Sequence, residues 1–202
     1  MKKLLICLLC ASPVAVLYAQ DSSEKYLPEI KAGTQFEFNF SGKAGDDLNV
    51  AGEILSTDHG GLSLVDSIPF KGKIQLVRTV ITKKGMESGS RMKTPNEQPT
   101  SKSDGSLLYV LSDDKTDHCF SRQFIRTLKE RKSASYGGIT YTLTDPPPGQ
   151  AVLLDGRELD AIYIVSTNGR KKFWILNDPL YPFILKSASE NINVRLVRIS
   201  NP

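Results

Sequence analysis

Cysteine is scarce in this 202-residue chain, and its distribution limits how the fold can be stabilised. Two of the three cysteines, Cys7 and Cys10, lie within the first ten residues. Only Cys119 remains in the rest of the chain, so an intramolecular disulfide is excluded there. Stability must come from a hydrophobic core, and about 180 residues beyond the N-terminal segment suffice for one domain with a sizeable core.

The chain also lacks a large excess of charge of either sign. The chain has 26 Lys and Arg against 22 Asp and Glu, and both signs are spread along its length. Blocks of like charge, which bind nucleic acid or anionic lipid, do not occur. We therefore expect no nucleic-acid partner.

Only the N-terminus carries a long apolar run. Two lysines precede the apolar stretch 4–17, and Ala19 supplies a small residue for cleavage. The stretch is shorter than the roughly 20 residues that span a bilayer, and Pro13 interrupts it. This pattern is typical of a secretory signal peptide at 1–19, so we expect a periplasmic or secreted protein with no transmembrane segment after cleavage.

Catalytic and cofactor signatures are missing as well. The sequence has no G-x-S-x-G elbow, phosphate-binding loop, dinucleotide fingerprint or EF-hand loop. Its two histidines, His59 and His118, each follow an aspartate. Neighbouring side chains diverge, however, so neither pair is suited to chelate a metal by itself. We expect no catalytic residue, no metal site and no cofactor.

A hydrolase that uses His59 or His118 is the alternative. A helix that begins at Asp117 would place Cys119 at its N-terminus, where the helix dipole lowers the pKa of a thiol. A catalytic pair also needs an imidazole that the tertiary structure orients toward its partner. A hydrolase therefore requires one histidine to lie in a cleft, within hydrogen-bond reach of a carboxylate, Cys119 or a serine.

Alternating apolar residues predict strands along most of the chain. The pattern is clearest where three phenylalanines alternate with polar residues at 36–40, and the first four runs indicate an antiparallel meander. About ten strands are predicted, at 36–40, 48–56, 62–65, 74–82, 107–111, 139–143, 152–154, within the hairpin 159–176, at 183–185 and at 194–199.

The stretch from Leu159 to Lys186 contains the clearest hairpin signal. Asn168-Gly169 suits a type I′ turn between two apolar runs. Counting outward from this turn predicts three cross-strand pairs, Ile164 with Phe173, Tyr163 with Trp174 and Ile162 with Ile175. Both faces of the hairpin are apolar, so we expect a central pair of strands that is covered on both sides.

One helix and one long loop interrupt the β pattern. The spacing predicts a helix over 117–132, capped by Asp117 and lying on one face of the hairpin. Its apolar stripe consists of Phe120, Phe124, Ile125 and Leu128. Residues 83–105 are rich in Ser, Thr, Pro, Lys and Gly, which predicts a long mobile loop, either a tolerated insertion or a lid.

These elements predict a mainly β (α+β) single domain over 20–202, a curved antiparallel sheet or half-barrel of about ten strands with one covering helix. The second apolar face of the hairpin needs a cover, because leaving it wet costs several kcal/mol at roughly 25 cal/mol per Å². That cover is a second layer of protein or an apolar ligand such as a lipid or acyl chain. The predicted ligand contacts are Tyr163, Trp174, Leu176 and Phe124.

The stretch Phe173–Lys186, FWILNDPLYPFILK, resembles exported β-rich proteins of Gram-negative envelopes, in which a Trp-bearing strand runs into a proline corner. More distantly, the last third of the chain and the helix resemble the periplasmic lipoprotein carriers, whose curved sheet holds acyl chains. Those carriers have more helix than this sequence. The resemblance implies a non-enzymatic binding or structural module of the envelope, and a module that pairs through a strand edge is a further alternative.

Overall fold

The computed structural model describes residues 24–42, 47–94 and 96–202. The predicted signal peptide at 1–19 lies outside these residues. Across the described ranges, no helix is both long enough and apolar enough to cross a membrane.

The described chain is mainly β. Its helical elements are η1 (Asp58–Gly60), α1 (Lys83–Ser88) and α2 (Arg122–Arg131). Its strands are β1 (Gln35–Gly42), β2 (Asp47–Ser56), β3 (Leu62–Phe70), β4 (Lys73–Ile81), β5 (Arg91–Met92), β6 (Thr100–Ser101), β7 (Leu107–Val110), β8 (Lys115–Thr116), β9 (Ser133–Tyr136), β10 (Ile139–Thr144), β11 (Leu153–Leu154), β12 (Arg157–Glu158), β13 (Ala161–Ser166), β14 (Lys172–Leu176), β15 (Ile184–Ala188) and β16 (Ile192–Ser200).

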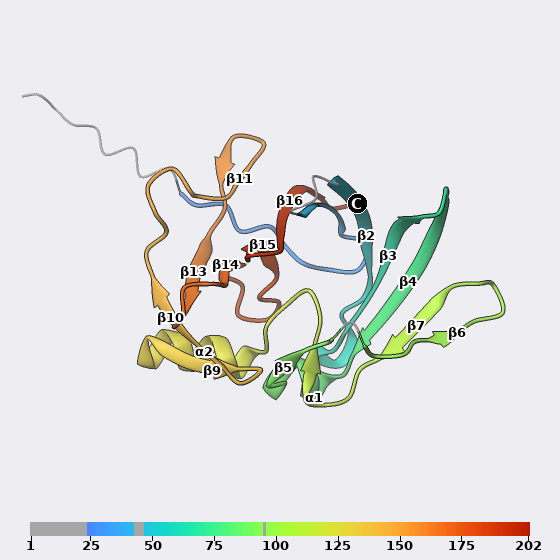
Figure 1. Cartoon of the computed structure of the whole chain (residues 1–202), viewed down its shortest axis with the longest axis horizontal. Coiled ribbons are helices and arrows are strands. Elements are labelled where there is room, and N and C mark those ends of the chain that lie inside the picture. The colour runs from blue at the N-terminus through green and yellow to red at the C-terminus, as the bar shows by residue number, and fades with distance from the viewer. Residues whose placement is uncertain (1–23, 43–46, 95) are drawn as a thin grey trace, which may run out of the picture.

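Twelve of these strands form one curved sheet that does not close into a barrel (Figure 1). The order is β6-β7-β4-β3-β2-β1-β16-β15-β14-β13-β10-β9, so β6 and β9 form the edges. All neighbours are antiparallel except β4 and β7, which run parallel. The predicted curved sheet is confirmed, with twelve strands where about ten were expected.

The meander and the hairpin have the predicted pairing. β1 to β4 pair consecutively and antiparallel. In the hairpin, β13 pairs with β14 in the register Ile162–Ile175, Tyr163–Trp174 and Ile164–Phe173. The predicted type I′ turn is wrong: Gly169 has a φ of +71°, but Asn168 does not have positive φ, and the Gly169 amide donates to the Ser166 backbone oxygen, so Thr167 and Asn168 are the central residues of the turn. The register is nevertheless the predicted one, because the two apolar runs specify which faces are buried.

α2 covers one face of the hairpin, as predicted. Its buried side chains pack against the buried isoleucines of β13 and β14 and against two tyrosines of β9 and β10. This cluster consists of Phe120, Phe124, Ile125, Leu128, Tyr136, Tyr141, Ile164 and Ile175. Because the apolar stripe of α2 faces the sheet, the helix packs as a second layer on these strands.

The opposite face of the hairpin is covered by the chain itself. Tyr163, Trp174 and Leu176 are buried in the larger core cluster, which also contains Val152, Leu154 and Leu159 from the β11–β12 region. The N-terminal segment closes over this region, where Tyr26 forms a parallel bridge with Leu159. The second apolar face of the hairpin is therefore covered by other parts of the chain.

The predicted start of the helix at 117 is wrong. α2 begins at Arg122, and the Ser121 hydroxyl accepts the capping hydrogen bond from the Phe124 amide. The segment 118–120 instead pairs with 182–184, with Cys119 opposite Phe183. Asp117 and Ser121 are both good N-cap residues, and the strand pairing decides between them.

The segment 83–105, predicted to be a long mobile loop, contains α1, β5 and β6. Lys83–Ser88 forms α1, capped by the Thr82 hydroxyl, and the Met86 side chain is fully buried. A Cβ at Gly85 would lie 2.7 Å from the Lys115 backbone oxygen, so this glycine permits close packing of α1 against β8. Glycine lowers helix propensity, which is why the sequence pattern concealed this helix.

Gly52→Ala is expected to destabilise the sheet. Gly52 lies in register between Phe36 of β1 and Asp66 of β3, and an added Cβ would collide with the Phe36 ring and lie 2.9 Å from Asp66 Oδ1. Overpacking of this kind costs about 1–3 kcal/mol of unfolding free energy in urea denaturation. Gly42→Ala is the control, because its Cβ would meet nothing within 4 Å. Equal stability of the two variants would contradict this packing.

Candidate ligand pocket

A pocket of 230 Å³ opens between β1, β15, β16 and the segment that leads into α2. Phe40, Val194, Ser187 and Phe173 form one cross-strand row, so the pocket lies on the face of the sheet that α2 covers. Its walls are mostly apolar and carry polar groups at one side. The lining residues are Phe38, Phe40, Met92, Asp117, His118, Ile184, Ser187 and Val194.

A second pocket of 400 Å³ adjoins the first along the same face. Met92 lines both pockets, and Phe173 of the second is the cross-strand neighbour of Ser187 of the first. Phe120, Tyr141 and Phe173 are among its walls. Methionine is unbranched and flexible, so Met92 is suited to vary the passage between the two spaces. Arg91, Lys93 and Lys171 also line the second pocket, so the path along the sheet leads from a mostly apolar space into one with both aromatic and cationic walls.

His118 and Asp66 form an ion pair at the side of the first pocket. The His118 Nε2 lies 3.0 Å from Asp66 Oδ2, and the two side chains are 18% and 7% exposed. His118 has a φ of +60°, and its backbone oxygen accepts a hydrogen bond from the Ile184 amide. A non-glycine residue in this conformation is strained, and such strain concentrates at functional positions.

Two carboxylates keep the imidazole protonated. Burial lowers the pKa of His118, but the charges of Asp66 and Asp117 and the hydrogen bond to Asp66 outweigh burial and raise the pKa to about 9. The charge of Lys93 opposes this increase, and its Nζ lies 3.5 Å from Asp117 Oδ2. His118 is therefore a cation at neutral pH, in a cluster of two cationic and two anionic side chains.

The His118 ion pair predicts a pH-dependent stability. The pKa rises from 6.5 to about 9 on folding, so the contribution is complete below about pH 6.5 and is lost as pH rises through about 9. Its size is about 3 kcal/mol. In urea denaturation, the stability difference between the unsubstituted protein and His118→Asn should shrink by this amount between about pH 6 and about pH 10.

His59→Asn is the matched control, because His59 also has positive φ and asparagine tolerates that conformation. His59 lies in the exposed turn η1, and its side chain does not line the pocket. The difference between the unsubstituted protein and His59→Asn should not vary over this pH range. A pH-independent effect of His118→Asn would contradict the ion pair.

Cys119 is not placed for nucleophilic chemistry. Its side chain is fully buried, and the Sγ lies 3.5 Å from the Met86 sulfur. Burial and the charge of Asp117 raise the pKa of the thiol, so the reactive thiolate is disfavoured. The expected position at a helix N-terminus is also wrong, because α2 starts three residues later.

The four residues predicted to contact a ligand lie apart from the pocket that His118 lines. Tyr163, Trp174 and Leu176 are at most 4% exposed, and the Lys186 Nζ lies 4.2 Å from the Trp174 ring. Phe124 borders a different cavity of 440 Å³, which is rich in serine and lies between α2 and β9. The ligand role of these four residues stays a prediction, and none of them lines the pocket at His118.

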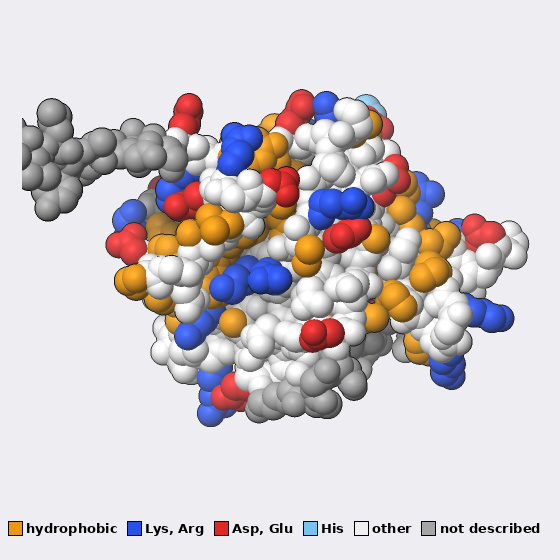
Figure 2. All heavy atoms as spheres, turned by 90° about the horizontal axis from the view of Figure 1, so that it is seen from above, with side chains coloured by type: hydrophobic (Ala, Val, Ile, Leu, Met, Phe, Trp, Pro, Cys, Tyr) orange, Lys and Arg blue, Asp and Glu red, His pale blue; other side chains and the backbone are white. Residues whose placement is uncertain are grey.

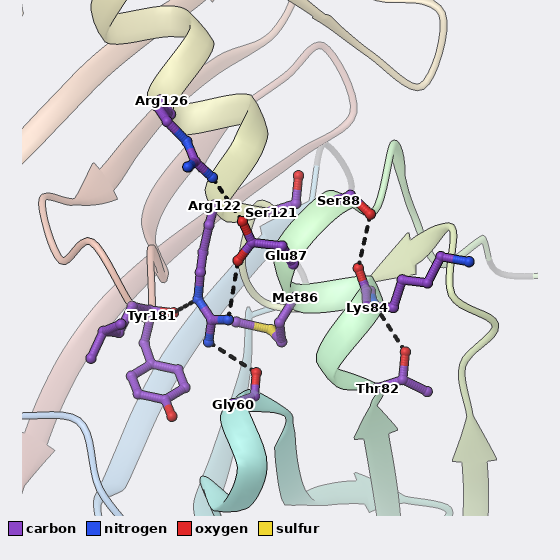
Figure 3. A network of polar contacts seen from close by, with 12 residues as sticks. Gly60, Thr82, Lys84, Met86, Glu87, Ser88, Ser121, Arg122, Arg126 and Tyr181 are labelled. Atoms are coloured by element: carbon purple, nitrogen blue, oxygen red, sulfur yellow. Dashed lines mark hydrogen bonds and ion pairs between the residues drawn. The ribbon is translucent and has the colours of Figure 1, made fainter.

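Arg122 fastens the segment that carries His118 (Figure 3). Its guanidinium donates hydrogen bonds to the backbone oxygens of Gly60 and Leu180, each at 2.9 Å, and lies 3.5 Å from Glu87. It thereby joins η1, α1, α2 and the loop before β15. Because α2 begins at Arg122, these contacts also fix the position of residues 117–121.

The face shown in Figure 2 has Lys and Arg interspersed with Asp and Glu, and neither sign gathers into a large patch. This agrees with the even distribution of charge along the sequence. Within the described ranges, no group of three or more His, Cys, Asp or Glu side chains is placed to hold a metal ion.

Sequence reasoning missed most of this site. Asp66 and His118 are 52 positions apart, and no local pattern links them. The alternation at 36–40 predicted a strand, but the pocket depends on Phe38 and Phe40 meeting Met92 and Val194 in the folded sheet. No protein-family model, curated protein or solved structure matches this chain.

Proposed function

We propose that this protein is an exported protein of the cell envelope that binds an apolar ligand, such as a lipid or acyl chain, without catalysing a reaction. The observation that carries the proposal is the pair of adjoining pockets on the α2 side of the sheet. Apolar pockets with a few placed polar groups are the usual form of a small-molecule site.

The shape of the site supports an elongated ligand. The hairpin faces are already covered by protein, so the ligand takes up the space between the two core clusters and does not replace a missing layer. Phe40 and Val194 pack partly against one cluster, and Met92, Phe173 and Ile184 against the other. These partly buried side chains gain cover when an acyl chain lies along them, at roughly 25 cal/mol per Å².

Export and binding are tested together by native mass spectrometry. The full chain is expressed for export, purified from the envelope fraction without detergent and then extracted with solvent. A co-purifying lipid of defined mass, and a polypeptide that starts at Gln20, are the expected results. A clean polypeptide mass with no uptake of an added acyl probe would reject ligand binding.

A hydrolase is the second candidate, because His118 lies in a pocket within 3.0 Å of a carboxylate. The raised pKa of about 9 argues against it, since a protonated imidazole cannot act as a general base at neutral pH. Ser187 lines the same pocket, yet no hydrogen bond joins it to His118 in the described structure. Hydrolysis of p-nitrophenyl decanoate that is lost in His118→Asn and kept in His59→Asn would favour the hydrolase.

A further inference from the structure

We infer that the pocket selects a ligand whose apolar chain ends in an uncharged hydrogen-bond acceptor, such as an ester or amide carbonyl, and that His118 donates to this acceptor. This inference rests on the proposed apolar-ligand function and specifies the head group that the same site recognises. It is argued from the orientation of the imidazole, the charges around it and the walls of the pocket.

The imidazole has one nitrogen engaged and one available. Nε2 is bound to Asp66 Oδ2 at 3.0 Å. Nδ1 makes no hydrogen bond to the described residues, and it is not among the fully buried polar atoms that lack a partner. Nδ1 therefore keeps accessible surface, and we place that surface in the pocket that His118 lines. The protonated ring carries a hydrogen on both nitrogens, so Nδ1 presents a donor to the ligand.

Asp66 holds the ring in this orientation. It is 5% exposed, and its position on β3 is fixed by the register with Gly52 of β2. Because Asp66 binds Nε2, the ring cannot turn Nδ1 away from the pocket without breaking a buried, charge-assisted hydrogen bond. Asp66 is therefore a positioning residue for the donor, and the strained backbone of His118 is consistent with a fixed orientation.

The surrounding charges favour an uncharged acceptor over a carboxylate. His118 and Lys93 supply two positive charges, and Asp66 and Asp117 supply two negative charges. Lys93 is held by Asp117 at 3.5 Å and by the Tyr109 ring, 4.3 Å from its Nζ. A ligand carboxylate would add an unpaired negative charge beside Asp117 in a partly buried site, which is unfavourable.

The rest of the pocket suits an acyl chain. Phe38, Phe40, Ile184 and Val194 offer no charged group, and past Met92 the neighbouring pocket has the aromatic walls Phe120, Tyr141 and Phe173 together with Arg91, Lys93 and Lys171. With its carbonyl at His118, a ligand would extend its chain along the row that leads from Val194 to Phe173. An acyl ester of a lipid and an acyl amide share this chemistry.

Three probes with the same ten-carbon chain test the head group. Methyl decanoate has an uncharged acceptor, decanoate has a carboxylate, and decyltrimethylammonium has no acceptor. Each is titrated against the full-length exported protein loaded with Nile red, and displacement is read from the fluorescence. N-methyl decanamide is added as a fourth probe to separate amide from ester recognition.

Methyl decanoate or the amide should displace Nile red at about tenfold lower concentration than the two charged probes, as expected for one hydrogen bond in a dry pocket. His118→Asn should remove this preference by weakening the binding of methyl decanoate and of the amide. His59→Asn, which carries the same substitution at another residue with positive φ, should keep the preference. Circular dichroism verifies that each variant is folded.

The comparison of probes on the unsubstituted protein needs no variant, so it decides the inference even if His118→Asn does not fold. Equal displacement by all probes, or tightest binding of decanoate, would overturn the inference and leave apolar binding intact. A preference that survives in folded His118→Asn would also overturn it. Failure of the protein to bind Nile red or any of these probes would instead reject the proposed function.

Discussion

Val194→Phe is expected to abolish uptake of a fluorescent acyl ester. Val194 forms part of the pocket wall, so the larger ring projects into the 230 Å³ space and blocks the path that the acyl chain would take. Loss of most of the apolar contact area should weaken binding by more than about a hundredfold at roughly 25 cal/mol per Å². Fluorescence titration of the purified protein measures the change.

Val197→Phe is the matched control for this experiment. Val197 lies on the same strand, is 47% exposed and does not line the pocket. Its substitution should leave the affinity for the acyl ester unchanged. Equal loss of binding in both variants would indicate a general disturbance of β16, and unchanged binding in Val194→Phe would place the ligand elsewhere.

Arg122→Met is expected to lower the free energy of unfolding by about 3–5 kcal/mol. The guanidinium is 13% exposed and donates to two backbone oxygens, and hydrogen bonds to charged groups contribute about 1.5–3 kcal/mol each. Methionine keeps much of the aliphatic stem and removes only the donors. Urea denaturation followed by circular dichroism gives the value.

Arg126→Met isolates the role of the Arg122 contacts drawn in Figure 3. Arg126 lies one turn along α2 and also binds Glu87, at 2.7 Å, but its side chain is 59% exposed. Exposed ion pairs contribute about 0–1 kcal/mol, so this variant should remain close to the unsubstituted protein. Similar losses in the two variants would show that Arg122 does not fasten the four segments.

The parts of the fold predicted from the sequence are those that local rules determine. The hairpin register follows from the two apolar runs on either side of Asn168-Gly169, and the meander follows from short alternating strands with clear turns. The covering helix follows from its apolar stripe. In each case the residues that specify the structure lie within a few positions of each other.

The parts that were missed depend on contacts between distant segments. β7 pairs parallel with β4 after a crossover through α1, and no feature of Leu107–Val110 indicates the direction of pairing. The start of α2 at Arg122, with Ser121 as its N-cap, depends on the pairing of Cys119 with Phe183. Asp117 and Ser121 are both good N-cap residues, so sequence spacing alone cannot show which of them caps the helix.

The sequence did not indicate the pocket at His118, and the reason is again a contact between distant segments. The sequence directed attention to the aromatic pair Tyr163 and Trp174, because their face of the hairpin needed a cover. The β11–β12 region and the N-terminal segment supply that cover. The ion pair at the His118 pocket needs Asp66, which lies 52 positions away in the sequence. The neighbouring Asp117 gave no indication of this partner.

The most direct test of the central claim is a crystal structure with methyl decanoate that carries a bromine on its terminal carbon. The anomalous signal of bromine locates the end of the chain without ambiguity. We predict a bromine peak beside Met92 or Phe173, with the ester carbonyl at His118. A peak on an exposed face of the sheet, or an empty pocket at saturating ligand, would contradict the account.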